Sequence, residues 1–266
     1  MRRLWGAVFI LVLAACNTPA TEEPIPTLIT LDTFPTAIFL TDNAPPPGFS
    51  VFNADPIDVH LSDRQGWTYT VTGSFEGVFD DTGDQAEGIF EAQVWSNELG
   101  EARRVVLDVE GSAISPDDLG RRLEGVRISN DFYMVDTNGQ CTAGGEGAEI
   151  IADLSAGQLI GGVVNAVPTG HRQEIGGVPA WQYTFTLENI RLPAVHRNPS
   201  STVDIQADLW VSPDYNAVLL FEVRADVKQV EILSGERSVT GTLYLRYELD
   251  VPQLDVLPNI SVPHGC

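Results

Sequence analysis

The sequence predicts a mainly β (α+β) protein built on one large, curved antiparallel sheet of about 9–11 strands, with one or two short helices inserted at mid-chain. Three observations support this prediction. Apolar and polar residues alternate with a period of two over long stretches, turn residues separate these stretches, and helical patterns occur in only two places. With 266 residues, 43% of them hydrophobic, the chain has ample apolar material for the core of one large domain.

The N-terminus has the pattern of a secretory signal peptide. A basic start, Met1-Arg2-Arg3, precedes the apolar run Leu4–Leu13, which is too short to cross a bilayer. Leu13-Ala14-Ala15-Cys16 follows directly and resembles the lipobox of bacterial lipoproteins. The resemblance implies that residues 1–15 are a lipoprotein signal peptide and that Cys16 carries the lipid anchor, including palmitate. The alternative is an ordinary signal peptide followed by a chance Cys.

The next segment is a tether. Residues 17–27 carry three prolines and no hydrophobic period, so we expect residues 16–27 to form a Pro/Thr-rich link between lipid and domain. Residues 28–266 then form a single extracytoplasmic β-rich domain, because no polar linker divides the chain after residue 50. Residues 28–50 are either an ordered approach segment or more linker.

The strands begin near Gly66. From Trp67 to Phe79 apolar residues and glycines alternate with Thr, Ser and Glu, which predicts a long, half-buried strand. The same alternation continues at residues 90–94, 103–110 and 126–135, at spacings typical of a meander. Asp80–Asp84 between the first two strands has the residue types of a calcium loop without the spacing of an EF-hand, so we favour a hairpin turn.

The second half shows equally clear strands at residues 181–187, 203–211, 218–227 and 241–249. Ser212–Asn216 reads as the hairpin connection between two of them, because Pro, Asp and Asn favour turns. Two helices are expected. Ser115–Leu123 begins with an N-cap, a first-turn Pro and two acids, and Ala148–Ile160 carries an apolar stripe of about three turns.

The three cysteines divide into a lipidation site and a pair. If Cys16 carries lipid, Cys141 and Cys266 remain, and outside the cytoplasm we expect them to form a disulfide. A nucleophilic role for Cys141 has little support, because residues 138–142 supply neither a His nor a cationic neighbour to lower its pKa.

Charge excludes several partners. Fifteen Lys and Arg face 37 Asp and Glu, a net charge of −22, which becomes −24 when Arg2 and Arg3 leave with the signal peptide. Such a chain does not bind nucleic acid, which needs Lys and Arg to neutralise phosphate. We expect a monomer in the cell envelope, held on the extracytoplasmic side of a membrane by the lipid on Cys16.

No catalytic or metal-binding pattern stands out. The four His residues are far apart, no Cys-x-x-Cys or Gly-x-Ser-x-Gly motif occurs, and the acids are spread too evenly to nominate a catalytic pair. We therefore expect no metal, no cofactor and no enzymatic activity.

The second half resembles bacterial lipoproteins of the LolA and LppX/LprG superfamily in the segments Gly176–Phe185, Ala207–Asp214 and Leu243–Leu249. Trp210-Val211-Ser212-Pro213-Asp214 matches the end of a strand that turns into the next one, although Tyr215–Val218 departs from the sequence that usually follows in that family. The resemblance implies a strongly curved sheet or half-barrel that wraps the helices and leaves an apolar cavity for acyl chains.

The resemblance also implies a function, the binding or carrying of a lipid or other hydrophobic ligand. The alternation gives the sheet an aromatic face that a curved sheet could present to such a ligand, and the candidate lining residues are Trp67, Tyr69, Phe75, Trp181, Tyr183 and Phe185. Core packing of these aromatics is the other interpretation. The alternative function is a non-enzymatic surface interaction or structural module that docks a partner protein.

Overall fold

The computed structural model describes residues 43–114, 121–233 and 235–266, all within one compact unit, Phe39–Cys266. The signal peptide, Cys16 and the tether lie outside the described residues. Among the described helices, none is both long enough and apolar enough to span a bilayer.

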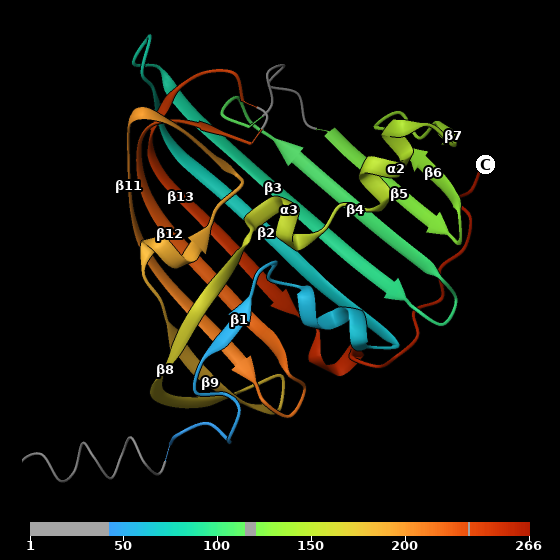
Figure 1. The fold of residues 1–266 in the computed structure, drawn as a ribbon. Helices are drawn as coiled ribbons and strands as arrows, with labels where there is room; N and C mark the ends of the chain where they lie inside the picture. The colour runs from blue at the N-terminus through green and yellow to red at the C-terminus, as the bar shows by residue number, and fades with distance from the viewer. Residues whose placement is uncertain (1–42, 115–120, 234) are drawn as a thin grey trace, which may run out of the picture. The chain divides into compact units, whose positions relative to one another are not determined.

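Thirteen antiparallel strands form one open, curved sheet, which confirms the predicted fold class (Figure 1). Their order is β1-β8-β9-β11-β12-β13-β2-β3-β4-β5-β6-β7, and β10 pairs with β8. Three strands, β1, β7 and β10, have only two or three residues, and the other ten fall within the predicted range of 9–11. The bounds are β1 Phe52–Ala54, β2 Gly66–Phe79, β3 Gln85–Asn97, β4 Ala102–Glu110, β5 Arg121–Ile128, β6 Asp131–Val135, β7 Cys141–Ala143, β8 Gly162–Ile175, β9 Val178–Thr184, β10 Ile190–Arg191, β11 Val195–Ser212, β12 Ala217–Ile232 and β13 Val239–Leu249.

The period-two alternation decides which face of each strand is buried. On β2 the inward residues from Trp67 to Phe79 are mostly buried and the residues between them are more exposed. The turns predicted at Asp80–Asp84 and Ser212–Asn216 lie where expected, between β2 and β3 and between β11 and β12. Alternation and turn residues together therefore locate the central strands correctly.

The helical predictions need two corrections. The helix expected at Ser115–Leu123 is wrong for residues 121–123, which begin β5 and pair with β4, and residues 115–120 lie outside the described residues. The single helix expected at Ala148–Ile160 is two, α2 (Glu146–Ala152) and α3 (Ala156–Ile160). The break occurs because Ser155 starts a new helix with a capping box, accepting from Gln158 N while the Gln158 side chain accepts from Ser155 N.

Several elements cross the concave face of the sheet. In Figure 1, β1, the 3-10 helix η1 (Val59–Asp63) and α3 lie over the middle of the sheet, and α2 lies over β5 and β6. Two further 3-10 turns, η2 (Leu187–Asn189) and η3 (Val251–Gln253), connect strands or follow the last one. These covering elements divide the concave face into differently filled regions.

The C-terminal segment runs along the ends of the strands. Asp255 N donates to Gly66 O at 2.8 Å, and Asn97 Nδ2 donates to Pro258 O at 3.1 Å. The chain then reaches β7, where Cys266 forms a disulfide with Cys141 and their Cα atoms are 5.4 Å apart. The predicted disulfide is confirmed, and it ties the C-terminus to the last strand of the sheet.

Candidate functional site

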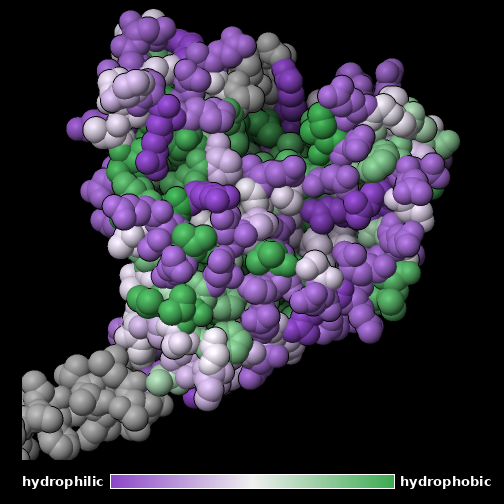
Figure 2. Space-filling view, in the orientation of Figure 1, coloured by the Kyte–Doolittle hydropathy of each residue, from purple (hydrophilic) through white to green (hydrophobic). Residues whose placement is uncertain are grey.

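The concave face contains an apolar hollow of about 350 Å³, which we call the hollow. Strands β3 and β4 form its floor, α2 and α3 form one wall, and the segments next to β11 and at the end of β12 form the opposite wall. In Figure 2, apolar residues gather in the hollowed upper part of this face. Nine of the eleven lining residues are apolar: Phe90, Leu107, Val109, Ile114, Ile151, Leu154, Leu159, Pro193 and Leu233, with Gln158 and His196 as the polar members.

The inward residues of β3 differ in size, and the large one, Phe90, borders the hollow. Over Gly88 the space is taken by Ile114, because a Cβ atom at Gly88 would come within 2.5 Å of the Ile114 side chain. The apolar side chains of Leu107, Val109, Leu154 and Leu233 border the hollow and are only half-buried. Because protein interiors are normally close-packed, unfilled apolar space of this size is a feature that a ligand could occupy.

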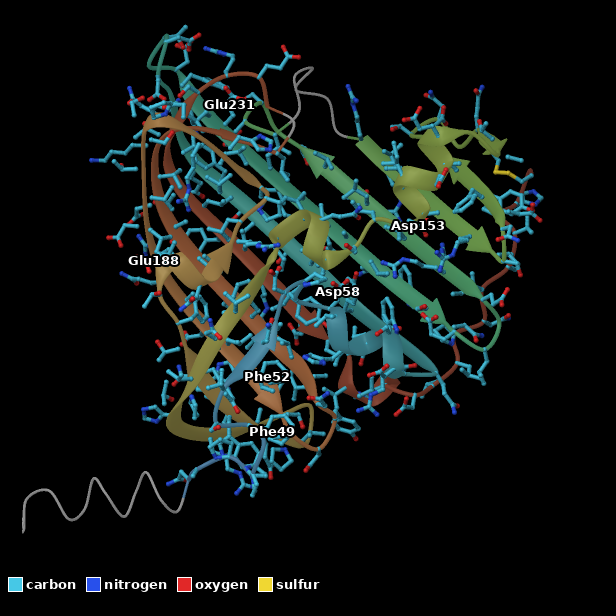
Figure 3. All side chains as sticks on the ribbon, in the orientation of Figure 1. Phe49, Phe52, Asp58, Asp153, Glu188 and Glu231 are labelled. Atoms are coloured by element: carbon cyan, nitrogen blue, oxygen red, sulfur yellow. A yellow bond between two sulfur atoms is a disulfide. The ribbon has the colours of Figure 1, made fainter. Side chains whose placement is uncertain are left out.

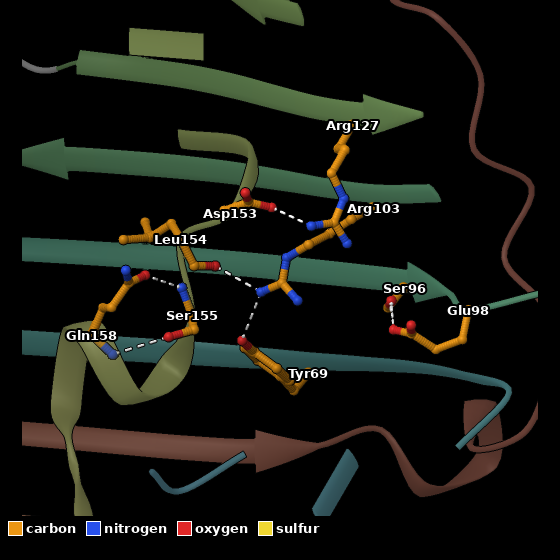
Figure 4. Close-up of polar contacts among 9 residues, drawn as sticks. All are labelled: Tyr69, Ser96, Glu98, Arg103, Arg127, Asp153, Leu154, Ser155 and Gln158. Atoms are coloured by element: carbon orange, nitrogen blue, oxygen red, sulfur yellow. Dashed lines mark hydrogen bonds and ion pairs between the residues drawn. The ribbon is translucent and has the colours of Figure 1, made fainter. Parts of the chain in front are cut away.

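A buried polar cluster holds the helical wall against the sheet. The Tyr69 hydroxyl donates to Asp58 Oδ2 at 3.0 Å and accepts from Ala156 N at 2.9 Å. Arg103 donates to Leu154 O at 2.8 Å and also reaches the Tyr69 hydroxyl at 3.4 Å (Figure 4). Burial raises the pKa of Tyr69 well above its usual value, and the nearby Asp58 carboxylate raises it further, so Tyr69 stays neutral and able to donate.

A second polar contact and a glycine fix α2. Arg127 of β5 donates to Asp153 at 2.6 Å, just after the helix ends (Figure 4). Gly125, also on β5, lies directly beneath the helix, because a Cβ atom there would come within 2.5 Å of Ala152 N. This close approach places Ile151 at the hollow, while the adjacent Ile150 is 57% exposed to solvent.

The six residues predicted to line a ligand site lie elsewhere. Five are buried in the core, and Phe185 is partly buried and packs against Phe221. Trp67 stacks on Tyr69 at 5.2 Å between ring centroids. None of the six lines the hollow: Trp67, Tyr69, Phe75, Trp181, Tyr183 and Phe185. Whether any of them contacts a ligand stays a prediction.

The aromatics of β9 are held by the chain segment before β1. Trp181 Nε1 donates to Asn43 O at 2.9 Å, and Tyr183 donates to Phe49 O at 2.7 Å. Burial raises the pKa of Tyr183 to about 12. The Phe49 and Phe52 rings stack at 6.1 Å between centroids in the same region (Figure 3), and the Phe52 ring also lies 5.9 Å from that of Tyr183. This part of the concave face is therefore filled by the protein itself.

A polar groove of about 500 Å³ on the outer face of the sheet is a weaker candidate. Its charged groups largely satisfy one another, since Arg246 pairs with Glu222 and with Glu248, the latter at 2.6 Å. Asp208 likewise accepts from Gln182 at 2.5 Å. Within the described part of the chain, no three His, Cys, Asp or Glu side chains lie close enough together to hold a metal ion.

Sequence reasoning missed the residues of the hollow although it placed their elements. Ile151, Leu154 and Leu159 belong to the apolar stripe of the predicted helical segment, and Leu107 and Val109 to a predicted strand. A stripe or an alternation indicates which face turns inward. Whether the inward side chains fill the space depends on what the fold sets opposite them.

No protein-family model matches the sequence, and no curated protein sequence matches it. Solved structures of similar arrangement include a DUF1329 family protein from Desulfovibrio piger, with 11% identity over 74% of this chain and 94% of that one and a TM-score of 0.22. A LolA superfamily protein from Nitrosomonas europaea has 10% identity over 77% and 95%, with a TM-score of 0.24. An outer membrane lipoprotein-sorting protein domain from Vibrio parahaemolyticus has 9% identity over 73% and 88%, with a TM-score of 0.22.

Proposed function

We propose that this protein is a non-enzymatic, membrane-anchored extracytoplasmic lipoprotein that binds a lipid or another hydrophobic ligand in the hollow. The observation that carries the proposal is an apolar space of about 350 Å³ bordered by half-buried aliphatic side chains. This volume lies within the range of about 300–1,000 Å³ that is typical of small-molecule sites. A ligand there would bury apolar surface, and each Å² removed from water would stabilise the complex by about 25 cal/mol.

Two features of the chain support the extracytoplasmic setting. The disulfide between Cys141 and Cys266 suits an oxidising compartment. The lipobox ending at Cys16 would keep the protein beside a membrane, where lipids are supplied. The acidic charge of the chain opposes adsorption to anionic lipid surfaces, so the anchor rather than the domain would hold it there.

Native mass spectrometry with organic extraction tests the proposal. The sample is the chain from residue 28 to 266, which retains the compact unit Phe39–Cys266 and is expressed in an oxidising compartment. We expect a co-purifying lipid or other amphiphile at close to one molecule per protein. A ligand-free mass, unchanged after exposure to membrane extract, would contradict the proposal and favour a module that docks a partner protein.

Two adjacent isoleucines of α2 provide a matched pair of variants. Ile151→Glu places a carboxylate at the hollow, where an apolar ligand would have to desolvate it, so we expect the bound ligand to be lost. Ile150→Glu makes the same change at a residue 57% exposed to solvent and should leave the ligand in place. Equal occupancy in both variants would place the ligand outside the hollow.

A further inference from the structure

A second recess adjoins the hollow on the far side of α3. It measures about 640 Å³, and its walls carry Asp55, Ser155, Arg191 and Arg197. Gln158 and Pro193 line both the recess and the hollow, so the two share a border. The hollow is apolar, whereas the recess offers hydrogen-bonding and charged groups. A molecule that occupied both would need an apolar part and a polar part.

The recess contains a cation that is unpaired among the described residues. Arg191 pairs with Asp55 at 3.1 Å, but no described residue forms such a pair with the Arg197 side chain. Among the basic residues of the described ranges, only Arg197 and Lys228 have side chains that form no ion pair, hydrogen bond or ring contact. The chain has 37 acidic residues against 15 basic ones, so a basic side chain beside a cavity would be expected to pair with an acid.

The strand pairing is irregular next to Arg197, which bears on where its side chain points. The pairing of β11 with β12 shifts between Arg197 and Thr202, as it does where a bulge redirects side chains. The preceding residue, His196, lines the hollow, so two consecutive residues border the two cavities. Glu231 lies opposite His196 in the strand pair and is the nearest acid by register; Figure 3 labels it at the upper end of the sheet.

We propose that the ligand is an anionic amphiphile, whose apolar chain occupies the hollow and whose carboxylate or phosphate headgroup is bound by Arg197 in the recess. This inference rests on the proposed function and specifies its ligand class. The guanidinium group suits such a headgroup, because its planar set of donors binds carboxylate and phosphate oxygens in pairs. The exposed Arg191 stands on the same recess and adds positive potential, partly offset by Asp55.

The test compares probes that share a chain and differ in the headgroup. Oleate and 1-oleoyl lysophosphatidic acid are the anionic probes, oleyl alcohol is the neutral one, and inorganic phosphate lacks the chain. Binding to residues 28–266 is measured by isothermal titration at mildly alkaline pH. We expect both anionic probes to bind roughly 10-fold more tightly than the alcohol, as a charge-assisted contact provides, and phosphate alone not to bind measurably.

Arg197→Gln and Lys228→Gln form a matched pair, since each removes one exposed positive charge that has no partner among the described residues. We expect Arg197→Gln to abolish the preference for the anionic probes without changing the affinity for oleyl alcohol, and Lys228→Gln to change neither. Equal affinity of the unmodified protein for oleate and oleyl alcohol, or equal effects of the two variants, would overturn the headgroup assignment and leave the hollow as a ligand site. Binding of phosphate alone through Arg197 would overturn the assignment of an amphiphilic ligand. Failure to bind any chain-bearing probe would overturn both proposals.

Discussion

The two halves of the concave face have the same alternating pattern of apolar and polar residues, but they are filled differently. In the half over β2, β13 and β9, which we call the closed half, aromatic side chains meet one another and are covered by β1, η1 and α3. In the half over β3 and β4, which we call the open half, Phe90 and the surrounding aliphatic side chains border the hollow and leave it unfilled.

The difference shows that the hydrophobic pattern alone does not determine where this sheet keeps space. Tyr69 and Tyr247 pack at 5.1 Å between ring centroids in the closed half. Across the β2–β3 pair large and small residues alternate, since Phe75 lies opposite Gly88 and Gly73 opposite Phe90. A ligand in the open half would therefore supply volume that the closed half obtains from its own aromatics.

The largest expected effect on stability comes from removing the disulfide at the edge of the open half. The disulfide joins residues 125 positions apart, so Cys141→Ser with Cys266→Ser should lower the free energy of unfolding by about 4–5 kcal/mol in the chain-entropy description. Urea denaturation measures this loss. Reductant should destabilise the unmodified protein and leave the double variant unchanged; an effect of reductant on the double variant would contradict the assignment.

The same Leu→Ala substitution should lower the free energy of unfolding by different amounts in the two halves. Leu243 is fully buried in the closed half, so Leu243→Ala should lower the free energy of unfolding by about 2–5 kcal/mol. Leu107 already borders unfilled space, and Leu107→Ala in the ligand-free protein should cost about 1 kcal/mol or less, because it removes fewer contacts. Equal losses in urea denaturation would mean that the hollow is filled in solution.

Variants of two buried tyrosines distinguish the stability contributed by the polar cluster from that contributed by ring packing. Tyr69→Phe removes the hydroxyl that binds both Ala156 N and the Asp58 carboxylate, which keep only their mutual contact at 3.1 Å, so it should cost about 1–3 kcal/mol of stability. Tyr247 is equally buried, and its hydroxyl has no hydrogen-bond partner among the described residues. Tyr247→Phe breaks no hydrogen bond to a described residue and removes a buried, unpaired hydroxyl, so it should leave stability unchanged or raise it. A matching loss in both variants would show that ring packing alone holds the covering elements.

Alkaline pH should also destabilise the folded protein. Burial raises the pKa of Tyr69 and Tyr247 well above the usual value and that of Tyr183 to about 12. In the unfolded chain these groups lose their protons near pH 10, so above about pH 10 the folded state holds more protons and stability falls as pH rises. Below that pH they contribute no dependence. Urea midpoints against pH should fall less steeply for Tyr247→Phe, and parallel curves would contradict the burial of this hydroxyl.

Sequence patterns predicted the parts of the fold that depend on local chemistry. The alternation from Trp67 to Phe79, the turn at Ser212–Asn216 and the pairing of Cys141 with Cys266 are all confirmed. Residues 121–123 could not be assigned correctly, because their pairing with β4 overrides the local helix signal. The break at Ser155 does have a local signal, the capping box formed with Gln158, whereas the contacts of Ala156 and Leu154 with Tyr69 and Arg103 depend on the tertiary fold.

The candidate site was predicted less well than the fold. Alternation identified inward residues such as Trp181 and Tyr183 but could not show that the segment before β1 covers them. That Arg197 has no partner within the described part of the chain is likewise a property of tertiary neighbours, since its sequence surroundings carry no signal of it.

Photo-crosslinking tests most directly the claim that the ligand occupies the open half. Residues 28–266 are incubated with palmitic acid that carries a diazirine at the end of its chain, irradiated, digested and mapped by mass spectrometry. We expect crosslinks in the peptides that contain Leu107 and Ile151, which border the hollow. Crosslinks confined to the peptides that contain Trp181 and Phe185 would contradict the account and restore the aromatic face of the closed half as the binding surface.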